Sequence, residues 1–204
     1  MMGTTHICIG VASALALTMP ENVGGCIAAI VGGAVGGSIS DIDVSSKKNG
    51  MGSLYAKLIA TGIIPLALVF DYIVDGVIVD YMKKCNSTNL TIGIIMFILL
   101  CLIGSKQDHR GFTHSLLALS LFSVSIALFC KPIFIPFFIG FTSHLLLDTL
   151  NKKSIKLFFP LKKGVSLDIC YANKTMDKLL LLIGAIGTVV VLCYSLFKNS
   201  INNY

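Results

Sequence analysis

The chain has 204 residues, of which 55% are hydrophobic and only 13% are charged, and its mean hydropathy is +0.86. Soluble domains carry about 25% charged residues, so this composition excludes an ordinary soluble domain. The net charge of +6 fits attraction to an anionic lipid surface, whereas the absence of a basic patch with interleaved aromatic residues argues against a nucleic-acid partner.

Seven apolar runs predict an all-α integral membrane protein, a compact bundle of about seven transmembrane helices. A transmembrane helix needs about 20 apolar residues, and shorter runs are tolerated inside a bundle. Since no repeat or low-complexity linker is found, we expect one membrane-embedded domain over residues 1–204. The runs cover roughly residues 6–19, 23–39, 58–79, 90–104, 115–131, 133–150 and 178–197.

The first two runs indicate how the bundle begins. No basic residue precedes the first run, because the first lysine is Lys47, so we expect a retained helix and not a signal peptide. The second run contains Gly32-Gly33 and Gly36-Gly37. These are overlapping pairs of small residues, which let helices approach closely in lipid.

The third run is the least regular, because Asp71, Asp75 and Asp80 interrupt its second half; we interpret the first two as structural. If every run crosses the membrane, one side carries twelve basic residues and the other carries four. The positive-inside rule then makes the first side cytoplasmic. The N-terminus and the polar loop 151–177 would lie there, with the C-terminus outside. The twelve are Lys47, Lys48, Lys57, Lys106, Arg110, Lys152, Lys153, Lys156, Lys162, Lys163, Lys174 and Lys178, and the four are Lys83, Lys84, Lys131 and Lys198.

The same topology brings seven candidate metal ligands to the cytoplasmic face of an inner membrane. A third run that did not cross would split them across the bilayer, which favours seven spans. Histidine and aspartate are the expected ligands, because the seven cysteines lie mostly inside apolar runs and no CxxC pair occurs. The ligands are His6, Asp41, Asp43, His109, His114, His144 and Asp148.

Spacing supports metal binding by two of the clusters. His144 and Asp148 are four residues apart on a predicted helix and project from one face. The alternative is that Asp148 is a helix-end charge to which His144 donates a hydrogen bond. Asp41 and Asp43 alternate in a non-helical stretch, so both carboxylates face the same way. Here the alternative is a turn that ends the preceding helix.

The stretch His109-Arg110-Gly111-Phe112-Thr113-His114-Ser115 is the most specific motif. Gly111 permits a turn that lets both histidines reach one site. Arg110 is the only arginine, and its planar fork of donors suits phosphate oxygens; the alternative is an anchoring charge. Thr113 and Ser115 are expected to cap the next helix or to orient the imidazoles.

Taken alone, His6 would be interpreted as an interfacial side chain. Because it shares a membrane face with the other candidate ligands, we favour metal binding. Glu21, the only glutamate, is expected on the opposite side. The proton-transferring group must therefore be an aspartate, a histidine or a water activated by the metal. We assign catalytic roles to Arg110, Asp43 and His109.

Together these residues resemble the YdjM-like family of bacterial inner-membrane metal-dependent hydrolases. The resemblance rests on Thr5-His6, Ser40-Asp41-Ile42-Asp43, the 109–115 motif and Ser143-His144-Leu145-Leu146-Leu147-Asp148. The family is distantly similar to the zinc-dependent phospholipase C and P1-type nuclease group. This implies the same seven ligands, although the chain has no tryptophan and so no N-terminal tryptophan ligand.

The sequence therefore predicts a membrane-bound metal-dependent hydrolase, with a phosphoester of a lipid or lipid-linked molecule as the expected substrate. An amide or ester bond stays open. Zinc is the favoured cofactor, with manganese or magnesium as alternatives and one or two ions bound. The alternative function is a metal-ion carrier or sensor. A homo-oligomer is compatible with the sequence.

Overall fold

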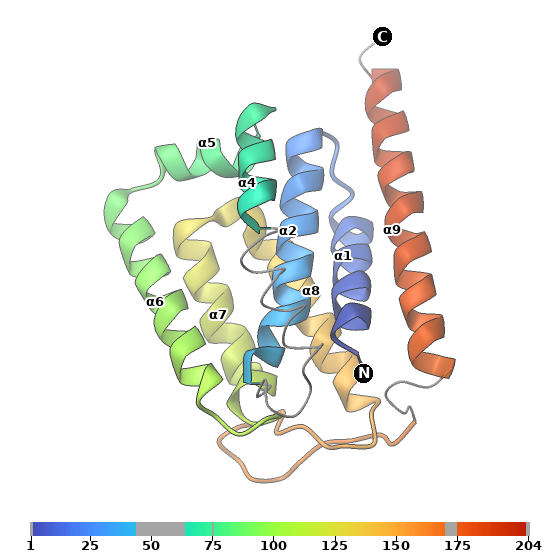
Figure 1. Cartoon of the computed structure of the whole chain (residues 1–204). Helices are drawn as coiled ribbons and strands as arrows, with labels where there is room; N and C mark the ends of the chain where they lie inside the picture. The colour runs from blue at the N-terminus through green and yellow to red at the C-terminus, as the bar shows by residue number, and fades with distance from the viewer. Residues whose placement is uncertain (1, 44–63, 75, 170–174, 203–204) are drawn as a thin grey trace.

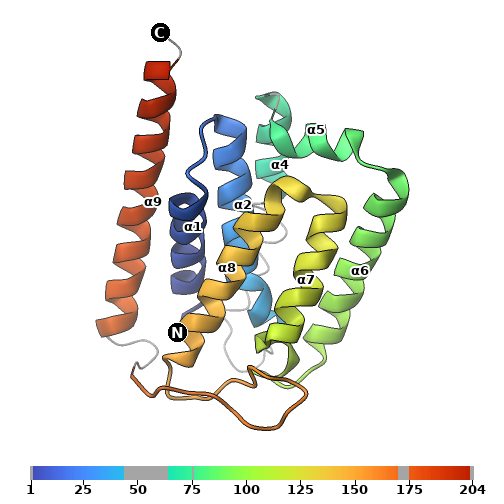
Figure 2. The ribbon, with the colours of Figure 1, turned by 180° about the vertical axis from the view of Figure 1, so that it is seen from behind.

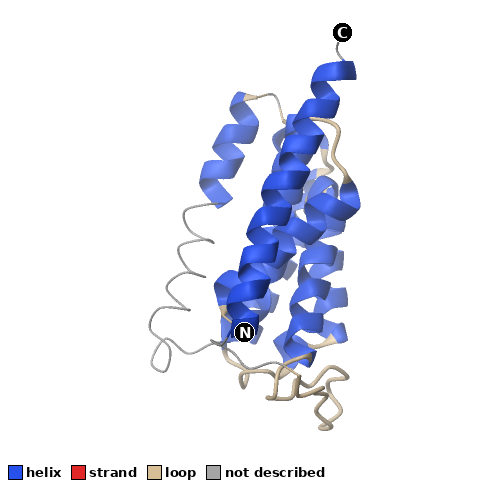
Figure 3. Ribbon diagram, turned by 90° about the vertical axis from the view of Figure 1, so that its right-hand side faces the viewer, coloured by secondary structure: helices blue, strands red, loops and turns tan. Residues whose placement is uncertain are grey.

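The computed structural model describes residues 2–43, 64–74, 76–169 and 175–202 (Figure 1). Predictions that involve Lys47, Lys48, Lys57, Asp75 or Lys174 lie outside these residues. The described part of the chain is mostly helical, and Ile155 and Val165 form an isolated β-bridge (Figure 3). The elements are α1 (Gly3–Thr18), α2 (Val23–Ile39), η1 (Ser40–Asp43), α4 (Ile64–Ile73), α5 (Val77–Lys84), α6 (Ser87–Ser105), η3 (Phe112–His114), α7 (Leu116–Phe129), α8 (Lys131–Thr149) and α9 (Thr175–Asn202).

Helices α1, α2 and α8 form the centre of the bundle, with α6 and α7 on one side and α9 packed against α1 (Figures 1 and 2). The main apolar core joins α2, α7 and α8 through Phe122, Phe137 and Phe141, all fully buried. In contrast, α6 and α9 expose apolar side chains such as Leu102 and Val189. Such exposure on long apolar helices fits contact with lipid.

The prediction of seven transmembrane helices is not supported. In the described residues, four helices are long and apolar enough to cross a membrane: Val23–Asp43, Ser87–Ser105, Lys131–Thr149 and Thr175–Ser195. The apolar helices α1 and α7 have 16 and 14 residues. At 1.5 Å per residue, each is shorter than the roughly 30 Å hydrocarbon core.

The described part of the third run is not one helix but two, α4 and the short helix α5, which lies across the end of the bundle (Figure 1). Asp71 organises the break: its carbonyl accepts a bond from Gly76 N at 2.7 Å, and its carboxylate accepts one from Val79 N at 2.9 Å. The side chain thus caps the first turn of α5, which agrees with the predicted structural role of Asp71.

The candidate ligands lie at one end of the bundle, as predicted, although seven membrane-spanning helices are not present among the described residues. We call this the site end; it holds the start of α1, η1, η3 and the end of α8 (Figure 1). Helix α6 begins at the opposite end and returns to the site end at Ser105. Helix α6 therefore runs toward the site end, as the predicted topology requires, although α4 is short.

The connection predicted as a polar loop is folded against the site end. Ile155 is fully buried in the main core, and Leu116 N donates to Leu157 O at 3.0 Å. The last residues of the predicted loop belong to α9, where buried Asp177 accepts a bond from Met2 N at 3.2 Å. This bond links the start of α9 to the start of α1.

Candidate metal centre

The innermost part of the site is built by two helices. His6, near the start of α1, and His144, near the end of α8, stack with their ring centroids 3.9 Å apart. His6 Nε2 lies 3.4 Å from Asp148 Oδ1, and His144 Nε2 lies 3.9 Å from Asp148 Oδ2. All three side chains are buried. The predicted pairing of His144 with Asp148 on one helix face is confirmed, and His6 joins it.

Glycines on α2 and α8 determine how closely α1 and α8 approach α2. A Cβ atom on Gly37 would lie 2.7 Å from His6 O, and one on Gly140 would lie 2.5 Å from Gly33 O. Both contacts are with backbone atoms, which no change of rotamer can move away. The second glycine of each doublet, Gly33 or Gly37, faces α1, whereas Gly32 and Gly36 face α8 around Pro136 and Phe137. The predicted close approach of helices at these glycines is thus confirmed.

Asp43, at the end of η1, organises the loop that carries the other histidines. His109 Nδ1 donates to its Oδ1 at 2.8 Å, while Arg110 N and Thr113 Oγ1 donate to its Oδ2 at 3.0 and 2.7 Å. His114 Nδ1 lies 3.4 Å from the same oxygen. One carboxylate therefore holds the 109–114 segment at four of its residues.

The predicted turn, which lets both histidines reach one site, involves Arg110 and Gly111. Arg110 adopts the left-handed conformation, with a φ of 67°. Gly111 is required for another reason: it has φ −90° and ψ −122°, and a Cβ there would lie 2.8 Å from Asp108 O. This ψ lies outside the regions that residues with side chains favour. Ser115 then caps α7 by accepting a bond from Ala118 N.

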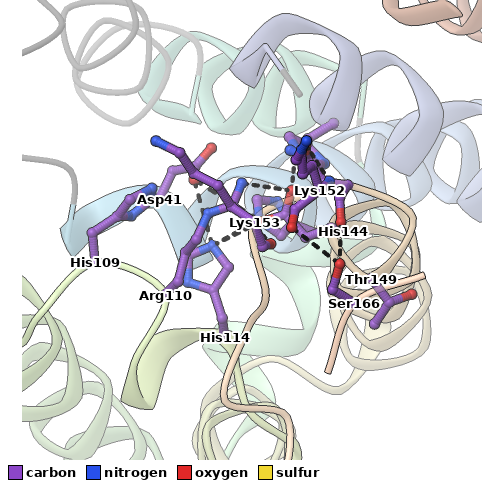
Figure 4. Close-up of polar contacts among 12 residues, drawn as sticks. Asp41, His109, Arg110, His114, His144, Thr149, Lys152, Lys153 and Ser166 are labelled. Carbon is purple, nitrogen blue, oxygen red and sulfur yellow. Dashed lines mark hydrogen bonds and ion pairs between the residues drawn. The ribbon is translucent and has the colours of Figure 1, made fainter. Parts of the chain in front are cut away.

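Asp41 connects the two parts of the site. Its Oδ1 lies 3.7 Å from His114 Nε2 and 3.8 Å from His144 Nε2, while these two nitrogens are 3.4 Å apart. His114 Nε2 also lies 3.3 Å from Asp148 Oδ2. Figure 4 shows Asp41, His114 and His144 gathered in one place, with Arg110 beside them.

Three overlapping groups of these side chains have ligand atoms within 4.8 Å of one another, the spacing that a metal ion needs: His6 with His144 and Asp148, Asp41 with His114 and His144, and Asp43 with His109 and His114. The donor chemistry fits a divalent ion such as zinc. His144 Nδ1 donates to Gly37 O at 2.8 Å, which leaves its Nε2 as an unprotonated donor atom directed into the cluster.

Other buried polar atoms at the site also fit an additional group. His6 Nδ1, Thr5 Oγ1 and Ser40 Oγ are buried and have no hydrogen-bond partner among the described residues. Buried polar atoms are nearly always paired in native proteins. Three such atoms beside a cluster of carboxylates and imidazoles could be satisfied by a further polar species at this end of the bundle.

His114 contributes to the balance of charge in the site. Burial alone lowers the pKa of His114, but its hydrogen bonds to Asp148, Asp41 and Asp43 outweigh burial and raise that pKa well above its usual value. A protonated His114 therefore offsets part of the negative charge of the three carboxylates. A bound divalent ion would take over the same compensation.

Arg110 covers the cluster from the loop side. Its guanidinium lies 3.7 Å from Asp148 Oδ1 and donates to Lys153 O, while its own carbonyl accepts from Lys156 N at 3.1 Å. Arg110 therefore links the metal-binding cluster to the 151–169 segment. This fits a role at the site and not that of a freely solvated anchoring charge.

Exposure differs between the ligands and shows which edge of the site is open to solvent. The side chain of His109 is 45% exposed and that of Asp41 is 20% exposed, whereas those of His6, His114, His144 and Asp148 are 3% exposed or less. The site is therefore open along the His109 and Asp41 edge and closed toward the bundle core.

Sequence reasoning missed two functional features of the site, both of them backbone carbonyls. Gly37 O orients His144, and Lys153 O holds Arg110. Carbonyl groups leave no signature in residue types, although the small-residue pattern at Gly37 indicated a close helix contact. The hydroxyls of Ser115 and Ser143 have structural roles, because Ser115 caps α7 and Ser143 donates to Gly140 O.

The arrangement can be compared with known proteins. The comparison with curated proteins and the comparison with solved structures gave no match. The similarity to the phospholipase C and P1-type nuclease group therefore stays a prediction. The model of the YdjM inner membrane protein family matches residues 1–202, nearly the whole chain, and the chain therefore belongs to that family.

Proposed function

We propose that the protein is a membrane-embedded, metal-dependent hydrolase that cleaves a phosphoester of a lipid or lipid-linked substrate at the cytoplasmic face. The observation that carries this proposal is the convergence of His6, His114 and His144 with Asp41 and Asp148. These groups come from four separate parts of the chain, and at this spacing they match the ligands of hydrolytic metal centres.

Two ions can be held at once, because two of the three ligand groups share no residue. His6, His144 and Asp148 form the buried group, and Asp43 with His109 belongs to the outer group, completed by His114. A divalent ion, when bound, supplies a Lewis acid and lowers the pKa of a water molecule that it coordinates. Zinc fits the mixed imidazole and carboxylate donors best, with manganese or magnesium as alternatives.

The chain's own residues would supply the remaining chemistry. Arg110 presents two guanidinium nitrogens beside the cluster, where they can stabilise negative charge that develops on a phosphoryl oxygen. His109 is held through Nδ1 by Asp43 and is the most exposed ligand. When only the buried group holds an ion, this pair can accept a proton at the open edge of the site and return it to the leaving group.

The position of the site supports a substrate of the membrane interface. His144 and Asp148 lie in the last two turns of α8, which is long and apolar enough to span a membrane. The open edge would therefore lie near the headgroup region and not near the bilayer centre. A water-soluble phosphodiester would reach the same groups, so lipid and soluble substrates have to be compared directly.

The test is metal analysis of the gently purified full chain, followed by a hydrolysis screen with phospholipids and a generic soluble phosphodiester in the presence of zinc or manganese. We expect bound metal and metal-dependent release of a phosphorylated product. Asp148→Asn should weaken metal binding. Its matched control is Asp80→Asn, since Asp80 is exposed on α5. Absence of bound metal together with absence of activity would contradict the proposal.

The alternative function, a metal-ion carrier or sensor, requires a different placement of ligands. Carriers bind their ion near the midplane of the bilayer, between interrupted helices. Here the donors gather at helix ends, which favours the hydrolase. Altered metal uptake by cells that carry Asp148→Asn, with no hydrolytic activity in the unsubstituted protein, would favour the carrier.

A further inference from the structure

The 152–169 segment, which we call the site-end loop, has two faces of different character. Its inner face packs against the bundle through fully buried Ile155 and through Phe159, whose ring meets that of Phe112 at a centroid distance of 5.8 Å. Its outer face exposes large apolar side chains: Leu161 is 65% exposed, and Phe158, Leu167 and Ile169 are more than half exposed. The loop is thus amphipathic, although it connects two long apolar helices.

Charge on the loop is strongly one-sided. It contains five lysines and a single acidic residue, Asp168. Lys162 and Lys163 are exposed directly after Leu161, so basic and apolar side chains adjoin along one stretch. An aqueous surface does not need several large apolar residues next to lysines. A phospholipid interface accommodates both, since acyl chains take the apolar groups and anionic headgroups take the ammonium groups.

The loop is held where such an interface must lie. Leu167 N donates to Thr149 O at 2.7 Å, and Ile169 N donates to Leu150 O at 3.0 Å. These bonds fix exposed Leu167 and Ile169 to the end of α8, one of the candidate membrane spans. The end of a span lies at the boundary between hydrocarbon and headgroups. Figure 1 shows the loop running across this end of the bundle from α8 toward α9.

We propose that the outer face of the site-end loop is a docking surface for the anionic lipid headgroups of the membrane in which the protein sits. Phe158 and Leu161 insert among the acyl chains, and Lys162 and Lys163 bind lipid phosphates. Docking would also steady Arg110, because Lys153 and Lys156 of the loop hold it through backbone bonds. Lipid binding by the loop does not depend on hydrolysis at the site.

The test uses the absence of tryptophan from the chain, which makes an introduced tryptophan the sole indole reporter. Phe158→Trp is placed in the full-length protein and reconstituted in nanodiscs with brominated acyl chains, which quench indole fluorescence on contact. One set of nanodiscs contains phosphatidylglycerol with phosphatidylcholine, and the other contains phosphatidylcholine alone. Phe159→Trp is the matched control, because the side chain at this neighbouring position packs toward the bundle.

We expect strong quenching of the indole in Phe158→Trp, deeper in the phosphatidylglycerol nanodiscs and weakened by salt, with little quenching in Phe159→Trp. Each lysine near an anionic surface contributes about 1 kcal/mol, so removing two should lower the ratio of docked to undocked loop by roughly 30-fold. Lys162→Gln with Lys163→Gln tests this in the Phe158→Trp background. Lys83→Gln with Lys84→Gln, an exposed lysine pair at the opposite end, should leave quenching unchanged.

Two results would overturn the proposal. If the indole in Phe158→Trp is open to iodide in water and untouched by brominated lipid, the outer face lies in solvent or against a protein partner. Quenching that is equal in both lipid mixtures and unaffected by loss of Lys162 and Lys163 would show apolar insertion without recognition of anionic headgroups. Retained helical content by circular dichroism confirms that each variant is folded before quenching is interpreted.

Discussion

The two halves of the candidate site are held in place by different forces. His6, His144 and Asp148 stand on helices whose backbones touch at glycines, and they are almost completely buried. His109 and Arg110 stand on a loop held by the hydrogen bonds of one carboxylate, Asp43. The helix half is therefore expected to determine metal affinity, and the loop half to determine how a substrate is bound and turned over.

Loss of Asp148 should have the largest effect, because this carboxylate contacts His6, His114, His144 and Arg110. Asp148→Asn keeps the shape but removes a charged ligand. We expect metal affinity to fall by more than the roughly 10- to 100-fold that outer-shell residues cost. The measurement is metal content after dialysis, with Asp80→Asn as control. Full metal occupancy in Asp148→Asn would show that the helix half is not the centre of the site.

The glycine contacts can be broken without touching a ligand. In Gly140→Ala the added methyl group meets Gly33 O, so α2 and α8 must separate. Overpacking of this kind costs about 1–3 kcal/mol, which at 2–4 °C per kcal/mol lowers the Tm by roughly 2–12 °C. Metal affinity should fall with it.

The matched control is Gly187→Ala on α9, where the nearest atom to the new Cβ is Ala12 Cβ at 3.6 Å. This is ordinary van der Waals contact, and alanine is the better helix former, so the Tm should hold or rise. Equal behaviour of Gly140→Ala and Gly187→Ala would contradict the role of the close α2 and α8 contact.

Arg110→Lys tests the role of the loop half. Lysine keeps the charge but loses the fork that reaches both Asp148 and Lys153 O. We expect kcat to fall by about 100-fold, in the range seen when one charge-stabilising donor is removed, with metal content unchanged. Lys153→Ala is the control, since it keeps the carbonyl that holds Arg110. Parallel loss of metal and activity in Arg110→Lys would mean that the halves are not separable.

Thr113→Val should have the smallest effect. It removes the hydroxyl that donates to Asp43 at 2.7 Å and preserves the side-chain shape. Asp43 keeps its bonds from His109 and Arg110, so we take the lower end of the range for a lost bond, about 1 kcal/mol, and expect kcat/KM to fall by roughly 5-fold. Thr149→Val, whose hydroxyl bonds to Leu146 O within its own helix, should leave kcat/KM unchanged. An unaltered kcat/KM in Thr113→Val would argue against Asp43 as the organiser of the loop.

The ligand types and their spacing made the site predictable. The four-residue step from His144 to Asp148 indicated convergent side chains, and the structure brings all seven candidates together. The predicted alternation of Asp41 and Asp43 in a non-helical stretch was wrong, because both residues belong to the 3-10 helix η1, where side chains two apart do not face the same way. The number of spans was not predictable from hydropathy, because apolar runs describe composition and not the break that Asp71 makes before α5. The left-handed turn at Arg110 was also missed, since a neighbouring glycine is the usual site for it.

Composition and local periodicity were enough to predict the membrane character, the helical class and the identity of the candidate ligands. Which ligands pair and which are exposed became clear from the packing of the helices. The structure also showed that backbone carbonyls of Gly37 and Lys153 orient His144 and Arg110. This is because side-chain chemistry follows from the identity of each residue, whereas distances between segments depend on how closely backbones pack.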